Sequence, residues 1–393
     1  MSHDPIVTTR APLGPAEVTR YARHVLVPGV GLEGQERLKA SRVLVVGAGG
    51  LGSPALLYLA AAGVGTIGVV DADVVELTNL HRQVIHTDAG IGRLKTESAE
   101  TAVHRVNPHV TVERHDLTLD STNALDVIGR YDLVVDGTDN FPTRYLVNDA
   151  CALLGKPHVW GSILRFDGQV SVWWAGHGPC YRCVFPQPPP PGSVPSCAEG
   201  GVLGVLCAAV GSVQSTEALK LLLGLGEPLT GRLLVHDALR QTWDTLTVRA
   251  DPGCPVCGES PTVTELVDYA DFCGVPRPGG QDAGERVPEV TVREMVDELA
   301  SEAPPLLVDV RGEQEREVVS IPGAVPVHLD LFRSGEAWSQ LPRDRRILVH
   351  CKVGGRSGEA TRLALAAGYT DVASVAGGVI EYVRQVDPTL PEY

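Results

Sequence analysis

A short apolar run at residues 43–46 is followed directly by the glycine-rich sequence GAGGLG and then by a mostly apolar stretch. A second apolar run, at residues 66–70, ends at the acidic residues Asp71 and Asp73. Short apolar runs bounded by turn residues are typical of buried parallel strands, whereas the longer stretch between them suits a helix. Residues 43–73 therefore predict strand, glycine turn, helix and strand, which is one half of a doubly wound, Rossmann-like sheet.

The pattern changes along the rest of this first domain. Apolar residues at helical spacing predict a helix within residues 14–42, and a third apolar strand is expected at residues 131–135. After residue 157, short strands flank Asp167-Gly168, a sequence that favours a hairpin turn. A hairpin joins antiparallel strands, so we expect a mixed sheet.

A stretch rich in glycine and proline at residues 274–288 predicts a linker. Beyond it, apolar strands at residues 306–310 and 347–350 alternate with helical segments, so both domains are expected to be α/β. Residues 261–272 are left open to packing on the first domain. The predicted organisation is a first domain over residues 1–260, a linker over residues 261–286 and a smaller domain over residues 287–393.

Charge and composition narrow the range of functions. The 393 residues include 48 acidic and 33 basic side chains, so the formal net charge is −15. Nucleic-acid binding depends on Lys and Arg at phosphates, and this balance argues against it. No apolar run approaches the roughly 18 residues of a membrane span, and the N-terminus lacks the apolar core of a signal peptide. We therefore expect a cytoplasmic protein without a membrane or nucleic-acid partner.

The glycine turn predicts a phosphate site. Gly47, Gly49 and Gly52 keep the GxGxxG spacing, which turns backbone amides toward a phosphate at the start of the following helix. Asp71 follows Gly52 by nineteen residues, where a carboxylate can accept both ribose hydroxyls. These features fit NAD as well as ATP, and a purely structural turn is the minority interpretation.

Residues after the second strand favour ATP. The sequence TNLHRQ at residues 78–83 and Lys95 place amide, arginine and lysine side chains just beyond the ribose acid. An enzyme that cleaves ATP between the α- and β-phosphates needs such cations, whereas a dehydrogenase does not. After the third strand, Asp139 is expected to hold Mg²⁺, and Asn140 is expected to face the same crevice while capping the next helix.

Four of the nine cysteines form two CxxC pairs, Cys180 with Cys183 and Cys254 with Cys257. Such pairs in a reduced chain predict a closed tetrahedral Zn²⁺ site with a structural role. A redox CxxC is the alternative, but neither pair lies in a thioredoxin-like setting. Between the pairs, a proline-rich loop carries Cys197, whose polar and glycine neighbours predict exposure.

A further cysteine, Cys351, follows the strand at residues 347–350 and opens the sequence CKVGGRS before a helix. Amide dipoles at a helix N-terminus stabilise a thiolate or a persulfide anion. Cys351 and Arg356 enclose four residues, whereas phosphatases of related shape enclose more, and the smaller loop fits sulfur better than phosphate. This loop therefore predicts sulfur transfer.

Two known families share these motifs. The first domain resembles the MoeB and ThiF adenylyltransferases of the ubiquitin-activating superfamily, through GAGGLG, Asp71, TNLHRQ, Lys95, DGTDN and both CxxC pairs. The second resembles a single rhodanese domain, through DVR, IPGA, HCKVGGRS and the pair Gly377-Gly378. The fusion, including PTVTELVDYADFCG between the halves, is similar to MoeZ-like proteins of the molybdopterin synthase sulfurylase type.

The resemblance implies a role for each candidate residue. Cys180, Cys183, Cys254 and Cys257 match zinc ligands. Cys351 matches a persulfide cysteine, in the loop closed by Arg356, and Cys197 matches a cysteine of a thioester or acyl disulfide step. Arg23 matches an arginine that reaches the partner's nucleotide in a homodimer. The matching ATP positions are Gly50, Asp71, Thr78, Asn79, Leu80, His81, Arg82, Lys95, Asp139 and Asn140.

The implied partner is a small ubiquitin-like sulfur carrier protein ending in Gly-Gly. On this interpretation, ATP and Mg²⁺ adenylate its C-terminal glycine. The Cys351 persulfide, filled from thiosulfate or from a cysteine desulfurase persulfide, then yields a C-terminal thiocarboxylate. The pathway is left open among molybdopterin, thiamin, cysteine and tRNA thiolation.

Four alternatives are left open. The chain could be an adenylyltransferase alone, a thiosulfate sulfurtransferase alone, or a nicotinamide-dependent oxidoreductase, which the glycine turn and Asp71 by themselves permit. It could also be a scaffold that binds carriers without chemistry. The presence of Arg82, Lys95, Asp139 and Cys351 argues against the scaffold.

Overall fold

The computed structural model describes residues 3–190, 200–274 and 287–393. The chain divides into two units, Met1–Pro278 and Gly279–Tyr393, which we describe separately. Cys197, predicted to lie in an exposed loop, is outside the described residues.

The first unit is built on one mixed sheet. Its strands are β1 (Arg42–Val46), β2 (Thr66–Val70), β3 (Thr111–His115), β4 (Leu133–Asp136), β5 (His158–Leu164), β6 (Asp167–Trp173), β7 (Arg232–Asp237) and β8 (Thr242–Thr247). The spatial order is β3-β2-β1-β4-β5-β6-β7-β8. The strands from β3 to β5 in this order are parallel, and the pairs from β5 to β8 are antiparallel. The predicted mixed sheet is thus confirmed.

The position of the hairpin turn was predicted wrongly. Leu164 pairs with Asp167, so the two turn residues are Arg165 and Phe166, and Arg165 has a positive φ of 53°. Gly168 instead lies within β6, where an added Cβ would come 2.6 Å from a methyl group of Val210. The glycine is therefore explained by the close approach of a helix rather than by the turn.

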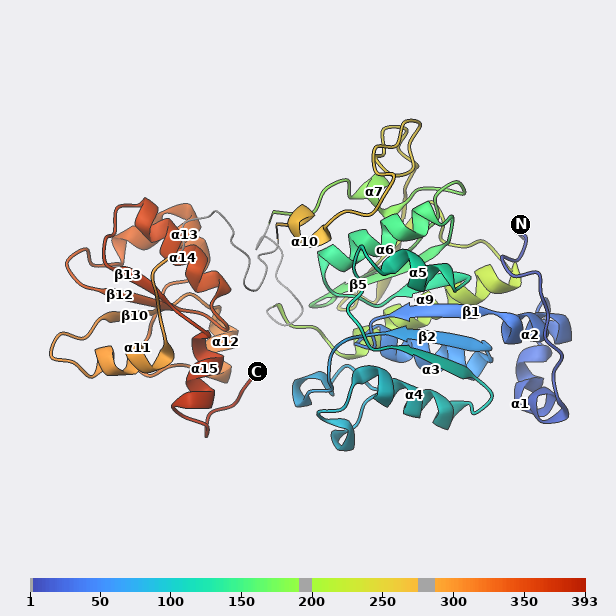
Figure 1. Ribbon diagram of the computed structural model, residues 1–393, viewed down its shortest axis with the longest axis horizontal. Helices are drawn as coiled ribbons and strands as arrows, with labels where there is room; N and C mark the ends of the chain where they lie inside the picture. The colour runs from blue at the N-terminus through green and yellow to red at the C-terminus, as the bar shows by residue number, and fades with distance from the viewer. Residues whose placement is uncertain (1–2, 191–199, 275–286) are drawn as a thin grey trace. The chain divides into compact units, whose positions relative to one another are not determined.

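Helices cover both faces of this sheet (Figure 1). Val43 and Val45 of β1 belong to the core beneath α3 and α9, and the alternate residues Leu44 and Val46 belong to the core beneath α5 and α6. The helices are α1 (Pro15–Val25), α2 (Gly31–Ala40), α3 (Gly52–Ala62), α4 (Lys95–Val106), α5 (Ala124–Gly129), α6 (Phe141–Leu153), α7 (Tyr181–Val184), α9 (Val205–Leu223) and α10 (Tyr269–Phe272), with 3-10 turns η1 (Leu77–Asn79) and η2 (Asp88–Gly90).

Among the described helices, α9 is long and apolar enough to cross a membrane. It packs against α3, β5 and β6 and carries the buried polar residues Gln214, Ser215 and Glu217. The Gln214 amide donates to the carbonyl of Asp136 at 2.7 Å, which ties α9 to β4. These contacts identify α9 as a core helix of the first unit, although it is longer than the apolar runs recognised in the sequence.

The first unit extends beyond residue 260, into the segment that the sequence assigns to the linker. Tyr269 on α10 is buried, and its hydroxyl donates to Asp149 of α6 at 2.7 Å. The ring of Phe272 lies 4.3 Å from the guanidinium carbon of Arg182 on α7. The packing left open for residues 261–272 is therefore present at α10.

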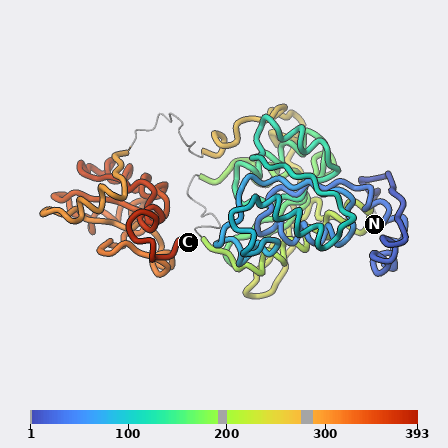
Figure 2. Tube along the Cα trace, turned by 60° about the horizontal axis from the view of Figure 1, so that its bottom comes forward, coloured from blue at the N-terminus to red at the C-terminus, as the bar shows by residue number. Residues whose placement is uncertain are grey.

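The second unit is drawn in orange to red in Figures 1 and 2. The strand pairs of its sheet are all parallel. Its strands are β9 (Glu289–Val290), β10 (Leu306–Asp309), β11 (Val325–Pro326), β12 (Ile347–His350) and β13 (Val372–Val375), in the order β11-β10-β12-β13-β9. Alternate strand residues again point to two apolar clusters, one on each face of the sheet. The helices are α11 (Val292–Leu299), α12 (Glu313–Val318), α13 (Leu329–Ser334), α14 (Gly355–Ala366) and α15 (Gly378–Gln385), with a 3-10 turn η3 (Glu336–Ser339).

Candidate active site and metal centre

The predicted glycine turn joins β1 to α3. Gly47 has a φ of +90°, and a Cβ on Gly52 would lie 1.9 Å from the carbonyl oxygen of Gly47, so both positions require glycine. A Cβ on Gly50 would lie 2.7 Å from the sulfur of Cys207. The turn is therefore closely packed from behind, and its backbone amides at the N-terminus of α3 suit a phosphate.

Asp71, the predicted ribose acid, contacts this turn from the end of β2. Its carboxylate accepts hydrogen bonds from the amides of Ala48 and Asp73, each at 2.9 Å. Burial raises the pKa of Asp71, and the nearby ammonium of Lys95 opposes that effect. The structure thus brings the two halves of the nucleotide fingerprint together.

His86 supports the turn from below and was missed in the sequence. Its Nε2 lies 2.9 Å from the carbonyl of Ala48, and its Nδ1 lies 2.9 Å from the hydroxyl of Ser98. Burial lowers the pKa of His86, so the ring is neutral at pH 7. A carbonyl only accepts, so we assign the ring proton to Nε2, with Nδ1 accepting from Ser98. Its position just after TNLHRQ is the one signal that the sequence offers.

Local hydrogen bonds hold both predicted cations, Lys95 and Arg82. Lys95 opens α4 and is buried, and its Nζ donates to Asp73 at 2.8 Å. Arg82 donates to the carbonyl of Thr78 at 3.0 Å, and its Nη1 lies 2.9 Å from Nε2 of His81. Lys95 is close enough to Asp71 to oppose the rise that burial causes in the pKa of that acid, so it lies near the ribose acid. A Cβ on Gly50 would lie 3.8 Å from Cγ of Arg82, so Arg82 lies beside the glycine turn.

Two buried amide side chains in the same segment have unused acceptors. Asn79 and Gln83 are each at most 6% exposed, and no hydrogen-bond partner exists for Oδ1 of Asn79 or Oε1 of Gln83 among the described residues. The Gln83 amide nitrogen lies 3.7 Å from the position of a Cβ on Gly49. Buried polar atoms without partners are rare in folded proteins, and they fit a site that a polar ligand completes. Thr78 and Leu80, also predicted here, lie in and directly after η1.

The loop after β4 completes the crevice. A Cβ on Gly137 would lie 2.9 Å from the amide nitrogen of Gly52, so this loop touches the glycine turn. Asp139 is exposed two residues later. Asn140 accepts a hydrogen bond from the amide of Thr143 at 2.9 Å and so caps α6. The cap is present as expected, and the exposed carboxylate of Asp139 suits a hydrated cation such as Mg²⁺.

Arg23 is not brought to this crevice within one chain. It is exposed on α1, where neighbouring Tyr21 accepts a hydrogen bond from the Asn107 amide at 2.7 Å. The same amide donates to the carbonyl of Ala60 at 2.8 Å. Ala60 lies about 12 Å along α3 from Gly52. α1 therefore packs at the end of α3 opposite to the glycine turn.

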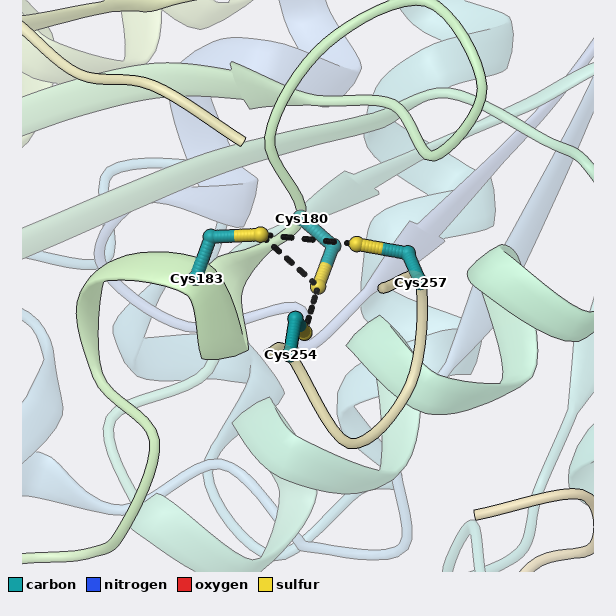
Figure 3. Close-up of side chains that lie close together, drawn as sticks. All are labelled: Cys180, Cys183, Cys254 and Cys257. Carbon is teal, nitrogen blue, oxygen red and sulfur yellow. Dashed lines mark hydrogen bonds between the residues drawn. The ribbon is translucent and has the colours of Figure 1, made fainter. Parts of the chain in front are cut away.

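The four predicted metal ligands converge (Figure 3). The sulfur atoms of Cys180, Cys183, Cys254 and Cys257 all lie within 4.8 Å of one another. The closest pairs are Cys183 with Cys257 at 3.4 Å and Cys180 with Cys254 at 3.5 Å. A tetrahedral ion with bonds of about 2.3 Å to sulfur places its ligands about 3.8 Å apart, so this cluster fits the size of zinc.

A buried ion pair anchors the segment from Cys180 to Cys183, which we call the metal knuckle. The sequence did not predict this pair. Arg182, between Cys180 and Cys183, donates to the two carboxylate oxygens of Asp149 at 3.0 and 2.6 Å. Tyr269 donates to the same carboxylate. The knuckle is therefore fastened to α6 and α10 through one buried acid.

The predicted sulfur site lies between β12 and α14. Cys351 is buried, and its sulfur accepts hydrogen bonds from the amide of Gly354 at 3.1 Å and from the hydroxyl of Ser357 at 3.6 Å. Gly354 has a φ of +110°, a conformation that favours glycine. The loop thus surrounds one sulfur atom with donors at a helix N-terminus, as an anion requires.

Arg356, the other predicted residue of this loop, is held by an acid that the sequence did not indicate. Its two terminal nitrogens donate to the two oxygens of Glu315, each at 2.7 Å. Burial would raise the pKa of Glu315, but the paired guanidinium outweighs it and lowers that pKa to about 2. Glu315 is therefore ionised at neutral pH and fixes Arg356 beside the loop.

Comparison with known proteins gives each unit a family. The ThiF family model matches residues 21–256, and the rhodanese-like domain model matches residues 291–385. The chain is 50% identical to the "probable adenylyltransferase/sulfurtransferase MoeZ" of Mycobacterium tuberculosis over 393 residues, covering 99% of this chain and 98% of that one. It is 42% identical to the "adenylyltransferase and sulfurtransferase MOCS3" of Sus scrofa over 409 residues, covering 98% and 89%.

Two further relatives match the first unit. The "sulfur carrier protein adenylyltransferase" of Thermus thermophilus is 58% identical over 264 residues, which are 66% of this chain and 97% of that one. The crystal structure of E. coli MccB with MccA-N7isoAsn has a TM-score of 0.55 and 23% identity, covering 61% of this chain and 75% of that chain, and this likeness concerns the fold alone. The chain belongs to the ThiF family, in the group of adenylyltransferase/sulfurtransferase proteins that join a ThiF domain to a rhodanese-like domain.

Proposed function

We propose that this protein adenylates the C-terminal glycine of a ubiquitin-like sulfur carrier protein and converts it to a thiocarboxylate with sulfur from Cys351. The observation that carries the proposal is the pairing, in one chain, of a phosphate-type turn flanked by Lys95 and Arg82 with a thiol held by donors at a helix N-terminus. Relatives over the full length bear names that state both activities.

In the first reaction, a carboxylate oxygen of the carrier attacks the α-phosphorus of ATP, and the bond to the β-phosphate breaks to release pyrophosphate. Asp71 binds the ribose, and the glycine turn receives phosphate oxygens. Lys95 and Arg82 stabilise the charge that develops on the leaving group. Asp139 would hold Mg²⁺, which neutralises phosphate charge when bound.

In the second reaction, the terminal sulfur of a Cys351 persulfide attacks the carrier's acyl carbon and AMP leaves. The product is an acyl disulfide between the carrier and Cys351. A thiolate then attacks the Cys351 sulfur, the S–S bond breaks, and the carrier departs as a thiocarboxylate while the thiol becomes disulfide-bonded to Cys351. Either Cys197 or a small thiol supplies these electrons, and an acyl intermediate on Cys197 is the other role considered for that residue.

The four-thiolate cluster supports a structural zinc. All four ligand positions come from protein, so a tetrahedral ion there has no open position for a substrate. The cluster joins segments 74 residues apart in sequence, Cys180 to Cys254. We therefore assign zinc to the stability of the first unit rather than to catalysis.

An exposed apolar rim supports the carrier as partner. Phe166, Leu203, Val205 and Leu239 are all at least 43% exposed. Leu203 donates to the carbonyl of Arg165, and Ala238 donates to that of Phe166, so the three segments lie side by side. A Cβ on Gly204 would lie 2.4 Å from the carbonyl oxygen of His81, which places the rim beside the nucleotide segment. A carrier docked there has its C-terminal tail near the phosphates.

The proposal includes a homodimer, in which Arg23 has a role. This residue is remote from its own crevice, while the nearby turn between α1 and α2 exposes Leu26 and Val27 at 72% and 46%. An apolar surface of this kind is suited to a partner subunit. On this proposal Arg23 reaches the nucleotide of the second protomer.

Cytoplasmic location and the sulfur source complete the proposal. None of the eight cysteines among the described residues is in a disulfide, which suits a reducing compartment. Thiosulfate transfers one sulfur atom to the Cys351 thiolate and leaves as sulfite. A cysteine desulfurase persulfide transfers its terminal sulfur to Cys351 and leaves as a thiol. The net charge of −15 gives no support for nucleic-acid binding.

Exchange of labelled pyrophosphate into ATP tests the first half of this function. With a Gly-Gly carrier present, exchange is expected, and a carrier lacking the terminal glycine is expected to abolish it. Exchange that does not depend on the carrier would contradict the proposed substrate.

A further inference from the structure

Tyr393, the last residue of the sequence, packs beside the Cys351 loop. Its phenol oxygen accepts a hydrogen bond from Nη1 of Arg311 at 2.8 Å and donates to Oε1 of Glu315 at 2.9 Å. The Nζ of Lys352 lies 4.5 Å from the centroid of its ring. One side chain therefore contacts the loop after β10, helix α12 and the Cys351 loop.

The two groups bridged by the phenol belong to separate ion pairs. Arg311 is fully buried and pairs with Asp309 at 2.6 Å. Glu315 pairs with Arg356 through two bonds of 2.7 Å. A phenol can accept from one pair and donate to the other at the same time, whereas a phenylalanine at Tyr393 could do neither.

The same contacts fix both cations of the Cys351 loop. Lys352 and Arg356 are the two basic residues of the sequence CKVGGRS. The ring of Tyr393 holds Lys352 by a cation–π contact, and its hydroxyl holds Arg356 through Glu315. Fixed cations beside a thiol favour the approach of an anion without reorganisation during the reaction.

The chemistry of Tyr393 is suited to this task over the working pH range. Burial raises its pKa above the ordinary value for tyrosine. The phenol therefore keeps its proton and continues to donate to Glu315, whose own pKa of about 2 keeps it an acceptor. The bridge between the two ion pairs is thus expected at neutral pH.

We propose that Tyr393 is a positioning residue of the sulfur site, which holds Lys352 and the Arg356–Glu315 pair in the geometry that receives an anionic sulfur donor at Cys351. The inference rests on the proposed function of Cys351 as the persulfide cysteine. It goes beyond that function by naming the side chain that arranges the loop's charges.

The test uses the full-length protein and two alkylating agents that differ in charge. Iodoacetate is an anion and iodoacetamide is neutral, so the ratio of their rates at the Cys351 peptide, read by mass spectrometry, reports the positive potential at the loop. Tyr393→Phe removes only the hydroxyl bridge, and Tyr393→Leu removes the ring as well. Tyr382→Phe, which removes another partly buried hydroxyl from the same unit, is the matched control.

We expect Tyr393→Leu to lower the iodoacetate-to-iodoacetamide ratio about three- to tenfold, with a smaller loss for Tyr393→Phe and none for Tyr382→Phe. In a Lys352→Met background, Tyr393→Leu should lower this ratio by a smaller factor than it does alone, because the two residues act through one contact. A ratio unchanged by Tyr393→Leu, or a full-sized further loss in the Lys352→Met background, would overturn the proposal.

Steady-state sulfur transfer from thiosulfate supplies the second readout. We expect Tyr393→Leu to raise KM for thiosulfate more than it lowers kcat, whereas general destabilisation would lower the active fraction and leave KM unchanged. Equal KM values in wild type and Tyr393→Leu would overturn the positioning role. A wild-type protein that gains no sulfur mass on Cys351 refutes the persulfide function instead, and the alkylation ratio still decides the role of Tyr393.

Discussion

The ammonium of Lys95 lies 2.8 Å from a carboxylate oxygen of Asp73, and the two side chains differ sharply in environment, with exposures of 9% and 72%. Because Asp73 is open to water, its attraction for Lys95 is screened and the pair is weak. A phosphate group can therefore replace Asp73 as the partner of the buried ammonium. On the proposed function, Lys95 is a cation prepared for the leaving pyrophosphate.

Replacement of Lys95 by alanine should abolish carrier-dependent exchange of pyrophosphate into ATP. Loss of one preorganised charge at a developing anion typically lowers the rate by about 10²–10³-fold. Sulfur transfer from thiosulfate through Cys351 should continue in the same variant, because the two reactions use separate sites. Arg93→Ala is the control, since Arg93 is a nearby cation whose side chain is 44% exposed and pairs with Glu97. Equal losses in both variants would remove the specific role of Lys95.

Arg23 should complement a defective crevice in a second subunit. Arg23→Ala and Lys95→Ala proteins are each expected to be inactive in pyrophosphate exchange. Equal mixtures that are allowed to exchange subunits should recover about a quarter of the wild-type sites, because a mixed dimer has one crevice with both residues intact. Failure to recover activity, with mixed dimers verified by native mass spectrometry, would contradict action in trans.

Loss of one cluster thiolate should release the metal and loosen the knuckle. Cys183→Ser is expected to lower bound zinc from about one ion per chain to near zero, because a structural site needs all four thiolates. Hydrogen exchange should rise in peptides covering α7. Cys151→Ala, which removes a buried thiol outside the cluster, should keep its metal. Retention of zinc by Cys183→Ser would show that the ion is held elsewhere.

Lowering the pH should destabilise the second unit first through His350. Glu315, whose pKa is about 2, stays ionised until the pH is lower still. His350 is fully buried, and burial lowers its pKa from 6.5 to about 4, with Asp309 and Arg311 as its charged neighbours. Between these values the unfolded chain binds a proton that the folded chain does not. The free energy of unfolding therefore decreases as the pH is lowered through this window, by about 2 kcal/mol between pH 7 and pH 5.

Hydrogen exchange of β12 peptides in the intact chain, corrected for intrinsic rates, measures this loss. The pH dependence should shrink in His350→Phe and persist in His328→Gln, which alters a half-exposed histidine of the same unit. An unchanged slope in His350→Phe would assign the effect to other groups.

Much of the proposed nucleotide crevice could be predicted from sequence because its parts are local or lie at the ends of parallel strands. Residues 43–73 encode strand, turn and helix in consecutive letters, and the close packing of Gly47 with Gly52 follows from that order. The convergence of the two CxxC pairs was also predictable, since two such pairs in one chain are typical of a metal site.

The supporting contacts were not predictable because each joins residues far apart in the chain or of ordinary type. Glu315 lies 41 residues before Arg356, on a helix whose other acids are exposed. His86 follows a recognisable motif but carries no signal of its own. The hairpin turn was misplaced because a glycine required by the packing of α9 resembles a glycine required by a turn.

The central claim is that one chain both activates a carrier and supplies it with sulfur. The most direct measurement is intact-mass spectrometry of a Gly-Gly carrier after incubation with the full-length protein, ATP, Mg²⁺, thiosulfate and a thiol reductant. The account predicts replacement of one C-terminal oxygen by sulfur, a gain of about 16 Da per carrier, abolished by Lys95→Ala and by Cys351→Ala. A carrier whose mass is unchanged with the wild-type protein, or still rises with Cys351→Ala, would contradict it.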